Sequence, residues 1–230
     1  MTKRAVVVLS GGLDSTTCMG MAKEKGYELY PITFSYGQRH DREVEQAKKV
    51  AEFFGAQERH RIVDIGFFNQ IGGSALTDDS LTVPTDGVED DIPATYVPAR
   101  NMIFLSLASA YAEVIGAEAV VIGVSAVDYS GYPDCRPEFI ESMERTVNLA
   151  TKTGVTGQSI QIQAPLIDLT KKETVEEGLR LNVPYHLTTS CYQGDEKACG
   201  ECDSCRLRIK GFKEAGARDP VPYAISIDWT

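Results

Sequence analysis

The hexapeptide Ser10-Gly11-Gly12-Leu13-Asp14-Ser15 constrains the fold of this 230-residue chain more than any other segment. It follows the β-branched run 5–9, which is typical of a strand buried on both faces, and it leads into the helix-compatible residues 15–25. Two glycines let the backbone curl so that its N–H groups reach an anion. The serine hydroxyls add donors, and the following helix adds a partial positive charge of about half a unit. The hexapeptide therefore predicts a pyrophosphate-binding loop at the carboxyl end of the first strand, where open α/β sheets place ligands.

Two other glycine-loop patterns are absent from the sequence. There is no G-x-x-x-x-G-K-[ST] and no G-x-G-x-x-G, which argues against a Walker-type phosphate clamp and against a dinucleotide-binding fold. The alternative interpretation of the hexapeptide is an ordinary Gly-Gly turn in which Asp14 caps the helix.

Strand and helix patterns alternate along most of the chain and predict a Rossmann-like α/β fold. We expect one parallel five-stranded sheet with helices on both faces and right-handed crossovers. A long insertion that could serve as a lid interrupts the alternation at residues 66–95. The predicted domains are 1–186, the nucleotide-binding α/β domain, and 187–230, a small zinc-binding segment with a C-terminal helix and tail. The predicted strands are 5–9, 28–34, 58–63, 118–123 and 160–163, and the predicted helices are 15–25, 41–54, 101–115, 137–151 and 172–181.

Charge and hydropathy limit the functions open to the chain. The formal net charge is -10, and no run of basic residues is longer than two, so a nucleic-acid substrate is disfavoured. No stretch approaches 18 apolar residues, and the apolar run after the N-terminus is too short for a signal peptide. We therefore expect a soluble, cytoplasmic protein that binds neither nucleic acid nor membranes.

Four of the six cysteines are crowded near the C-terminus, at Cys191, Cys199, Cys202 and Cys205. Two overlapping C-x-x-C turns and one more distant thiolate can complete a tetrahedral shell of four sulfurs around zinc. Such a site has no open coordination position, so its expected role is structural. Redox-active cysteines and an iron–sulfur cluster remain as alternatives, because both use similar spacings.

The residues between the loop and the cysteines point to a known family. The hexapeptide resembles the PP-loop of the ATP pyrophosphatase and adenine nucleotide α-hydrolase superfamily. Together with four other segments it resembles the 7-cyano-7-deazaguanine synthases, and the resemblance spans nearly the whole chain. One departure is Thr189, where a tryptophan is expected before Ser190. The four other segments are 34–40, 96–101, 128–137 and 202–212.

The resemblance implies an ATP-dependent C–N ligase of queuosine biosynthesis. It would convert 7-carboxy-7-deazaguanine and ammonia into 7-cyano-7-deazaguanine, with ATP and Mg²⁺ and with one structural Zn²⁺ per chain. PP-loop chemistry favours adenylation of the carboxylate, attack by ammonia, and a second adenylation of the amide oxygen before elimination to the nitrile. A homodimer is expected from the same resemblance.

The resemblance also implies roles for individual residues. Asp14, Ser15 and Arg100 are the predicted catalytic residues, and Arg100 would neutralise phosphate charge or bind the substrate carboxylate. The alternative for Arg100 is a surface arginine that caps a loop. The predicted nucleotide-binding residues are Leu9, Ser10, Gly11, Gly12, Leu13, Asp14, Ser15, Thr16, Thr17, Tyr36, Gln38 and Arg39. The predicted substrate-binding residues are Arg100, Asn101, Asp128, Tyr129, Tyr132, Pro133, Asp134 and Arg136.

Two other functions remain to be weighed. One is a PP-loop enzyme that modifies tRNA by thiolation or lysidine-type ligation. A thiolase would need a reactive cysteine pair near the loop. Cys18 and Cys135 are the candidates, but Cys18 lies on the apolar side of the first helix and is expected in the core, whereas Cys135 lies in a polar loop and could be reactive. The other is a non-catalytic nucleotide sensor, which turnover of ATP would exclude.

Overall fold

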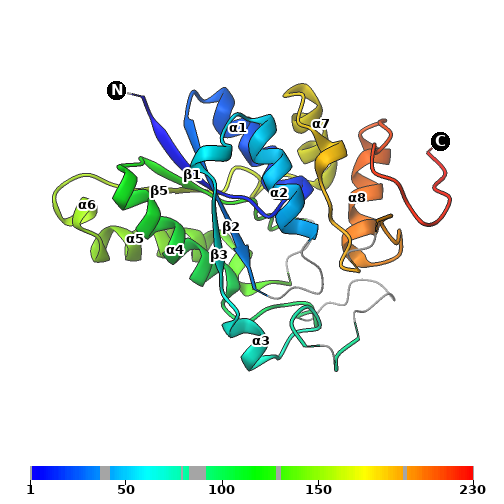
Figure 1. The fold of residues 1–230 in the computed structure, drawn as a ribbon, viewed down its shortest axis with the longest axis horizontal. Coiled ribbons are helices and arrows are strands. Elements are labelled where there is room, and N and C mark those ends of the chain that lie inside the picture. The colour runs from blue at the N-terminus through cyan, green and yellow to red at the C-terminus, as the bar shows by residue number, and fades with distance from the viewer. Residues whose placement is uncertain are drawn as a thin grey trace.

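A parallel sheet with the strand order β3-β2-β1-β4-β5 forms the centre of the computed structural model (Figure 1). The structure describes residues 2–36, 42–78, 80–82, 92–127, 131–193 and 196–229. Each neighbouring pair of strands is parallel, so every connection must cross over one face of the sheet. The strands are β1 (Arg4–Val8), β2 (Glu28–Ser35), β3 (Arg61–Asp64), β4 (Ala119–Val121) and β5 (Gln161–Gln163).

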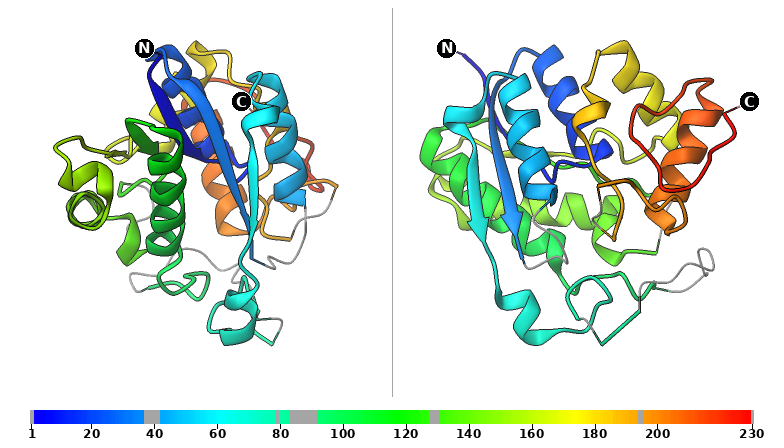
Figure 2. Two further views of the ribbon diagram at one scale, coloured as in Figure 1. Left: turned by 60° about the vertical axis from the view of Figure 1, so that its left-hand side comes forward. Right: turned by 45° about the vertical axis from the view of Figure 1, so that its right-hand side comes forward.

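Helices cover both faces of this sheet, as Figure 2 shows. Alternate residues of β1 explain why both faces must be covered, because Val6 and Val8 enter one apolar cluster while Ala5 and Val7 enter the other. The first cluster is closed by α4 (Arg100–Ile115) and α5 (Pro137–Ala150), and the second by α1 (Leu13–Glu24) and α2 (Arg42–Phe53).

A third apolar cluster joins the C-terminal part of the chain to the sheet domain. It brings Leu13 of α1 against Val175 of α7 (Lys171–Arg180) and Phe212 of α8 (Asp203–Glu214). Helices α7 and α8 pack side by side (Figure 1). The shorter elements are η1 (Gln57–Arg59), α3 (Phe67–Ile71), η2 (Pro133–Cys135), α6 (Lys152–Val155) and η3 (Tyr185–Leu187).

The strand order places the ligand crevice. From β1 the chain adds β2 and then β3 on one side of the sheet. It then returns to add β4 and β5 on the other side of β1, so the direction in which strands are added reverses between β1 and β4. Loops after two such strands diverge to opposite faces and leave a crevice at their carboxyl ends. In this chain the hexapeptide Ser10–Ser15, called the phosphate loop below, follows β1, and residues 122–125 follow β4.

The predicted fold class is confirmed, with differences at the boundaries. Strand β3 begins only at Arg61 because Gln57–Arg59 form a 3₁₀ turn, and β4 is limited to Ala119–Val121. The predicted insertion 66–95 contains the short helix α3, while residues 79 and 83–91 lie outside the described residues. The domain division at residue 186 stays a prediction.

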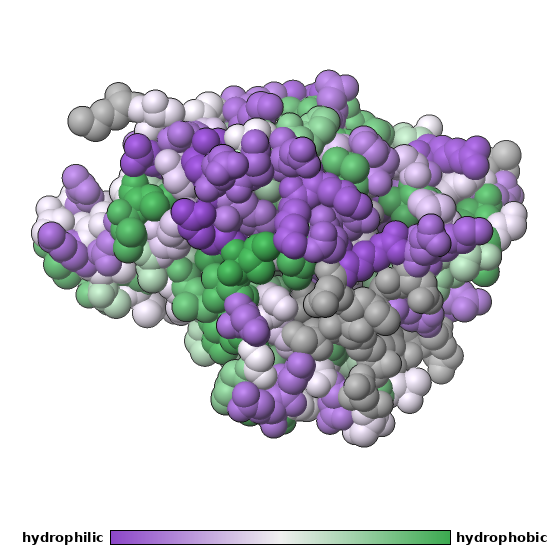
Figure 3. Space-filling model, viewed as in Figure 1, coloured by the Kyte–Doolittle hydropathy of each residue, from purple (hydrophilic) through white to green (hydrophobic). Residues whose placement is uncertain are grey.

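Among the described residues, no helix is both long enough and apolar enough to cross a bilayer. On the face shown in Figure 3, hydrophilic side chains cover α1 and α2, and apolar side chains gather beside the edge strand β3. Exposed apolar residues include Ile62 of β3 and Phe53 at the end of α2.

From the environment of His60, which precedes β3, we expect the free energy of unfolding to depend on pH. Its Nε2 lies 2.7 Å from Thr33 Oγ1, and that hydroxyl donates to Leu9 O at the start of the phosphate loop. Burial, aided by Lys48 and Arg61, lowers the pKa of His60 to about 4. An unfolded chain with a pKa near 6.5 binds the proton first, so stability is full above about pH 6.5 and falls as pH approaches 4.

We expect the variant His60→Gln, whose amide can still donate to Thr33, to lose this dependence. The measurement is urea unfolding at pH 7.0 and pH 4.5. Wild-type protein should lose more free energy of unfolding between the two pH values than H60Q, and equal losses would contradict the expectation.

Candidate active site

The phosphate loop is held open by its own hydroxyl groups. Ser10 N–H donates to Ser15 Oγ at 3.2 Å, the two serine hydroxyls lie 3.1 Å apart, and Gly12 N–H donates to Ser10 Oγ at 3.3 Å. Ser15 Oγ also contacts the carbonyl oxygen of Gly12. These contacts fold the loop over the N-terminus of α1, whose first N–H groups have no partner within the helix.

Three glycines lie at close backbone contacts around this loop, and at Gly11 the contact leaves no room for a Cβ. A Cβ on Gly11, where φ is +80°, would lie 2.5 Å from the carbonyl oxygen of Glu43 in α2. A Cβ on Gly123 after β4 would lie 3.0 Å from the backbone nitrogen of Ser15, and one on Gly12 would lie 3.3 Å from Thr189 O. The phosphate loop therefore packs against α2, against the residues that follow β4 and against Thr189, which precedes the first cysteine of the cluster.

The start of α4 is fixed by the loop that follows β4. Asn101 N–H donates to Asp134 Oδ2 at 2.9 Å, and the Asn101 side-chain amide donates to the carbonyl oxygen of Asp134 at 3.1 Å. A carboxylate at a helix N-terminus is stabilised by the free N–H groups and by the helix dipole. Ala99, at φ +58°, adopts a left-handed conformation that costs about 1–2 kcal/mol for a residue with a Cβ. The strain and the cap together set the direction of Arg100.

Arg100 faces two tyrosines inside the crevice. Its Nη1 lies 3.5 Å from the hydroxyl of Tyr36, and its guanidinium carbon lies 5.9 Å from the ring centre of Tyr132. Burial raises the pKa of Tyr36, so its hydroxyl stays protonated. Among the described residues, no carboxylate forms an ion pair with Arg100. An anion in the crevice would therefore meet a cation that is not already neutralised.

The phosphate loop and Arg100 line one common cavity of about 280 Å³. Its other walls come from the aromatic side chains after β2, from the end of β4, from Lys171 and from the cysteine-rich segment. Lys171 Nζ lies 2.6 Å from Asp14 Oδ1 within this cavity. The cavity thus joins an anion-binding loop to an aromatic wall that carries a cation, which suits a nucleotide beside a planar, carboxylate-bearing molecule.

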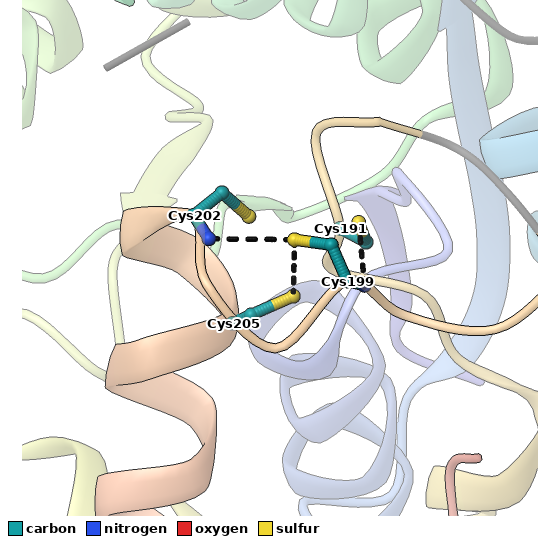
Figure 4. Close-up of side chains that lie close together, drawn as sticks. All are labelled: Cys191, Cys199, Cys202 and Cys205. Atoms are coloured by element: carbon teal, nitrogen blue, oxygen red, sulfur yellow. Dashed lines mark hydrogen bonds between the residues drawn. The ribbon is translucent and has the colours of Figure 1, made fainter. Parts of the chain in front are cut away.

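The four cysteines converge on one point, as Figure 4 shows. All four sulfur atoms lie within 4.8 Å of one another, and Cys199 Sγ lies 3.8 Å from Cys205 Sγ. Zn–S bonds of about 2.3 Å at tetrahedral angles place sulfurs about 3.8 Å apart. Four buried or half-buried thiols in this arrangement fit zinc, and they leave no ligand position for a substrate.

The cysteine-rich segment also forms part of the cavity wall. Arg208 of α8, with 3% of its side chain exposed, makes a bidentate ion pair with the buried Asp219 at 2.6 and 2.9 Å. Its Nη1 donates to Thr188 Oγ1 and Ser190 Oγ, at 2.8 and 3.2 Å. Tyr223 O–H donates to Asp219 Oδ2 at 2.7 Å, so this ion pair joins α8, the Ser190 segment and the C-terminal tail. Residues of this segment that line the cavity are Thr189, Ser190, Tyr192, Ser204, Leu207 and Arg208.

The structure places half of the predicted nucleotide- and substrate-binding residues in the wall of the cavity and the other half away from it or outside the described residues. The hydroxyls of Thr16 and Thr17 turn to the carbonyl oxygens of Gly12 and Leu13, and neither threonine lines the cavity. Pro133, Asp134 and Arg136 do not line it either; Asp134 caps α4, and Arg136 is exposed. Gln38, Arg39, Asp128 and Tyr129 lie outside the described residues. Predicted residues that line the cavity are Leu9, Ser10, Gly12, Leu13, Asp14, Ser15, Tyr36, Arg100, Asn101 and Tyr132.

Neither cysteine outside the cluster is poised to react. Cys18 is fully buried on α1, as its apolar position predicts, and burial raises the pKa of its thiol far above the ordinary value. Cys135 lines the cavity but is also buried, and burial raises the pKa of its thiol to about 12. A protonated thiol is a weak nucleophile, so burial argues against Cys18 and Cys135 as the reactive pair that a thiolase would need.

Several cavity residues were not predicted from the sequence. Their segments show ordinary helix or loop patterns without a functional motif, and the fold brings them to the phosphate loop at the edge of the sheet. These residues are Glu43, Ser125 and Lys171. Arg208 carried a signal, since it lies within the segment 202–212 that carries the family resemblance.

Comparison with known proteins identifies relatives over nearly the full chain. The family model described as "Queuosine biosynthesis protein QueC" matches residues 4–216. A 7-cyano-7-deazaguanine synthase of Oceanobacillus iheyensis is 64% identical over 96% of this chain and 98% of its own length. One from Acetivibrio thermocellus is 58% identical over 96% of this chain and 98% of its own length.

Solved structures with low sequence identity share the fold. NMN synthetase from Francisella tularensis superposes with a TM-score of 0.50 at 18% identity, over 94% of this chain and 79% of its own. A 4-thiouridine synthetase, solved with RNA and bound ATP, gives 0.50 at 21% identity over 93% of this chain and 50% of its own. The family match and the highly identical relatives cover nearly all of the sequence, and this chain belongs to the QueC family of queuosine biosynthesis proteins.

Proposed function

We propose that this protein is an ATP-dependent 7-cyano-7-deazaguanine synthase that joins 7-carboxy-7-deazaguanine to ammonia and forms the nitrile. The observation that carries the proposal is the shared cavity, in which the phosphate loop faces an aromatic wall bearing Arg100. The loop supplies N–H and hydroxyl donors for the triphosphate. The tyrosines offer π surfaces for a flat heterocycle, and Arg100 offers a fork of donors for its carboxylate.

The first half of the reaction makes the carboxylate electrophilic. A carboxylate repels nucleophiles because of its charge, so one of its oxygens first attacks the α-phosphorus of ATP. The bond to the β-phosphate breaks, pyrophosphate leaves, and an acyl-adenylate forms. Ammonia then attacks the acyl carbon and displaces AMP, which leaves the amide. The phosphate loop, with Ser10 and Ser15, would hold the leaving pyrophosphate.

The second half removes the remaining oxygen in the same way. The amide oxygen attacks a second ATP and releases pyrophosphate. Loss of AMP and two protons from nitrogen then gives the nitrile. One cavity serves both halves because each activates an oxygen on the same carbon, so two ATP are consumed for each nitrile.

The donor sets fit the two expected metals. Asp14 presents a carboxylate to the cavity with 36% of its side chain exposed, which suits Mg²⁺ bound jointly with phosphates. Magnesium would neutralise phosphate charge there. The four cysteines would hold zinc, which stabilises the cavity wall and takes no part in the reaction.

Arg100 gives the first prediction on activity. In the variant Arg100→Met, kcat/KM for the nitrile should fall by about 10²–10³-fold, because one charged donor at the reacting group is lost. Arg145→Met on the exposed side of α5 removes the same charge away from the cavity and should leave kcat/KM unchanged. Steady-state assay of nitrile formation measures both, and an active R100M would exclude Arg100 from the site.

Product analysis tests the proposed function. Purified protein is mixed with ATP, magnesium, ammonium and 7-carboxy-7-deazaguanine, and the products are identified by mass spectrometry against a mixture without the base. The proposal expects the nitrile together with AMP. The nitrile with ADP would keep the function and overturn the adenylation steps, and no change in the base would overturn the function.

The homodimer and the cytoplasmic location expected from the resemblance stay proposals. Helix α4 exposes Met102, Leu107 and Val114 on its outer side, which offers apolar surface for a second copy. Light scattering of a dimer would give twice the 25.2 kDa mass of one chain.

A further inference from the structure

Lys171 is a half-buried cation that contacts the phosphate loop. Its ammonium lies 2.6 Å from Asp14 Oδ1, and only 12% of its side chain is exposed. Among the described residues that line the cavity, the other cations are Arg100, against the aromatic wall, and Arg208, whose fork is bound to Asp219. Lys171 is therefore the cation placed to meet phosphates held by the loop.

The position of Lys171 is unfavourable for the helix that carries it. It is the first residue of α7, where the partial positive charge of the helix terminus repels a cation. Thr170 and Glu173 form a capping box that secures this terminus without help from the lysine. Lys172, the next residue, is exposed and pairs with Glu176 at 3.6 Å. Lys171 instead turns its charge into the cavity, where it pairs with Asp14.

Contacts on two sides position the start of α7, and one of them involves the Lys171 side chain itself. Ser125 Oγ donates to Leu169 O at 3.1 Å, which ties the residues before α7 to the end of β4. On the other side α8 approaches so closely that a Cβ on Gly211 would lie 2.6 Å from Lys171 Cγ and 3.0 Å from its carbonyl oxygen. The stem of Lys171 thus packs against α8, while the backbone just before it is tied to the end of β4. A side chain held in this way is ordered before a ligand arrives.

We propose that Lys171 binds the β- and γ-phosphates of ATP, and that its contact with Asp14 is the resting state of this pair. With the nucleotide bound, Asp14 would hold magnesium together with the phosphates, and the Lys171 ammonium would donate to the phosphate oxygens. Asp14 thereby holds the lysine side chain in place while the site is empty. The inference rests on the proposed function for the identity of the nucleotide, and it adds a residue that holds the pyrophosphate as it leaves.

The test is calorimetric binding of ATP, pyrophosphate and AMP to the full chain in the presence of magnesium. The variant Lys171→Met removes the charge and keeps the stem against Gly211, and Lys172→Met is the matched control on the same turn. K171M should bind ATP and pyrophosphate about 10- to 100-fold more weakly, as expected for a lost charged hydrogen bond, and AMP as tightly as wild-type protein does. K172M should bind all three like wild-type protein.

Either of two results would overturn the proposal: unchanged affinity of K171M for ATP and pyrophosphate, or an equal loss for AMP, which would place the effect at the adenosine or in the fold. Should K171M fail to fold, Lys171→Gln keeps a polar end towards Asp14 and allows the same comparison. These measurements need no base and no turnover, so they decide the role of Lys171 even if product analysis finds no nitrile.

Discussion

Removing one ligand of the cysteine cluster should cost the protein both its C-terminal segment and its activity. In Cys202→Ala we expect zinc content to fall from one per chain to well below one, with nitrile formation at background. A structural zinc site contributes about 10–16 kcal/mol in small domains, comparable to the whole stability of an ordinary domain. Ser190, Tyr192 and Arg208 would lose their support, and with them one wall of the cavity.

Metal analysis, thermal unfolding and the nitrile assay measure this prediction together. Glu201→Ala is the matched control, because Glu201 is exposed in the same loop and its side chain is not a ligand. E201A should retain zinc and activity. A zinc-free C202A with wild-type activity would show that the cluster does not support the cavity.

The buried ion pair between Arg208 and Asp219 should give the second largest effect. Arg208→Ala leaves a carboxylate buried without its partner, and breaking such a pair costs about 3–5 kcal/mol of unfolding free energy. Thr188 and Ser190 lose a donor in the same variant. Arg206→Ala, on the exposed side of α8, should change stability by less than about 0.5 kcal/mol.

Chemical denaturation of the two variants and of the double variant Arg208→Met/Asp219→Leu completes this experiment. The double variant replaces both charges by apolar groups and should be more stable than R208A, since no buried charge is left unpaired. An R208A protein that unfolds at the wild-type denaturant concentration would contradict the prediction.

The sheet and the phosphate loop were predictable because their patterns are local. A β-branched run followed by Ser10–Ser15 and a helix leaves few alternatives, and the same alternation along the chain sets the parallel sheet. Four cysteines at metal-ligand spacing were equally local, and their sulfurs do meet. Element boundaries moved by a few residues where short turns such as Gln57–Arg59 compete with the strand.

Much of the cavity depends on contacts between segments distant in sequence. Lys171 and Asp14 are separated by 157 positions, and Arg208 reaches the cavity only because Asp219 and Ser190 lie beside it. A sequence pattern also does not show whether a polar side chain points into the cavity or towards another part of the protein. Asp134 reads as a substrate ligand in a polar loop, but in the structure it caps α4, and Thr17 turns to Tyr185 instead of to a nucleotide.

Transfer of labelled oxygen tests the central claim, that the cavity activates both oxygens of the substrate by adenylation. The carboxylate of 7-carboxy-7-deazaguanine is labelled with ¹⁸O, the reaction is run to completion, and AMP and phosphate are examined by mass spectrometry. Adenylation of both oxygens should give two AMP for each nitrile, each carrying one ¹⁸O, and unlabelled pyrophosphate. Label in inorganic phosphate, with ADP as the nucleotide product, would contradict adenylation.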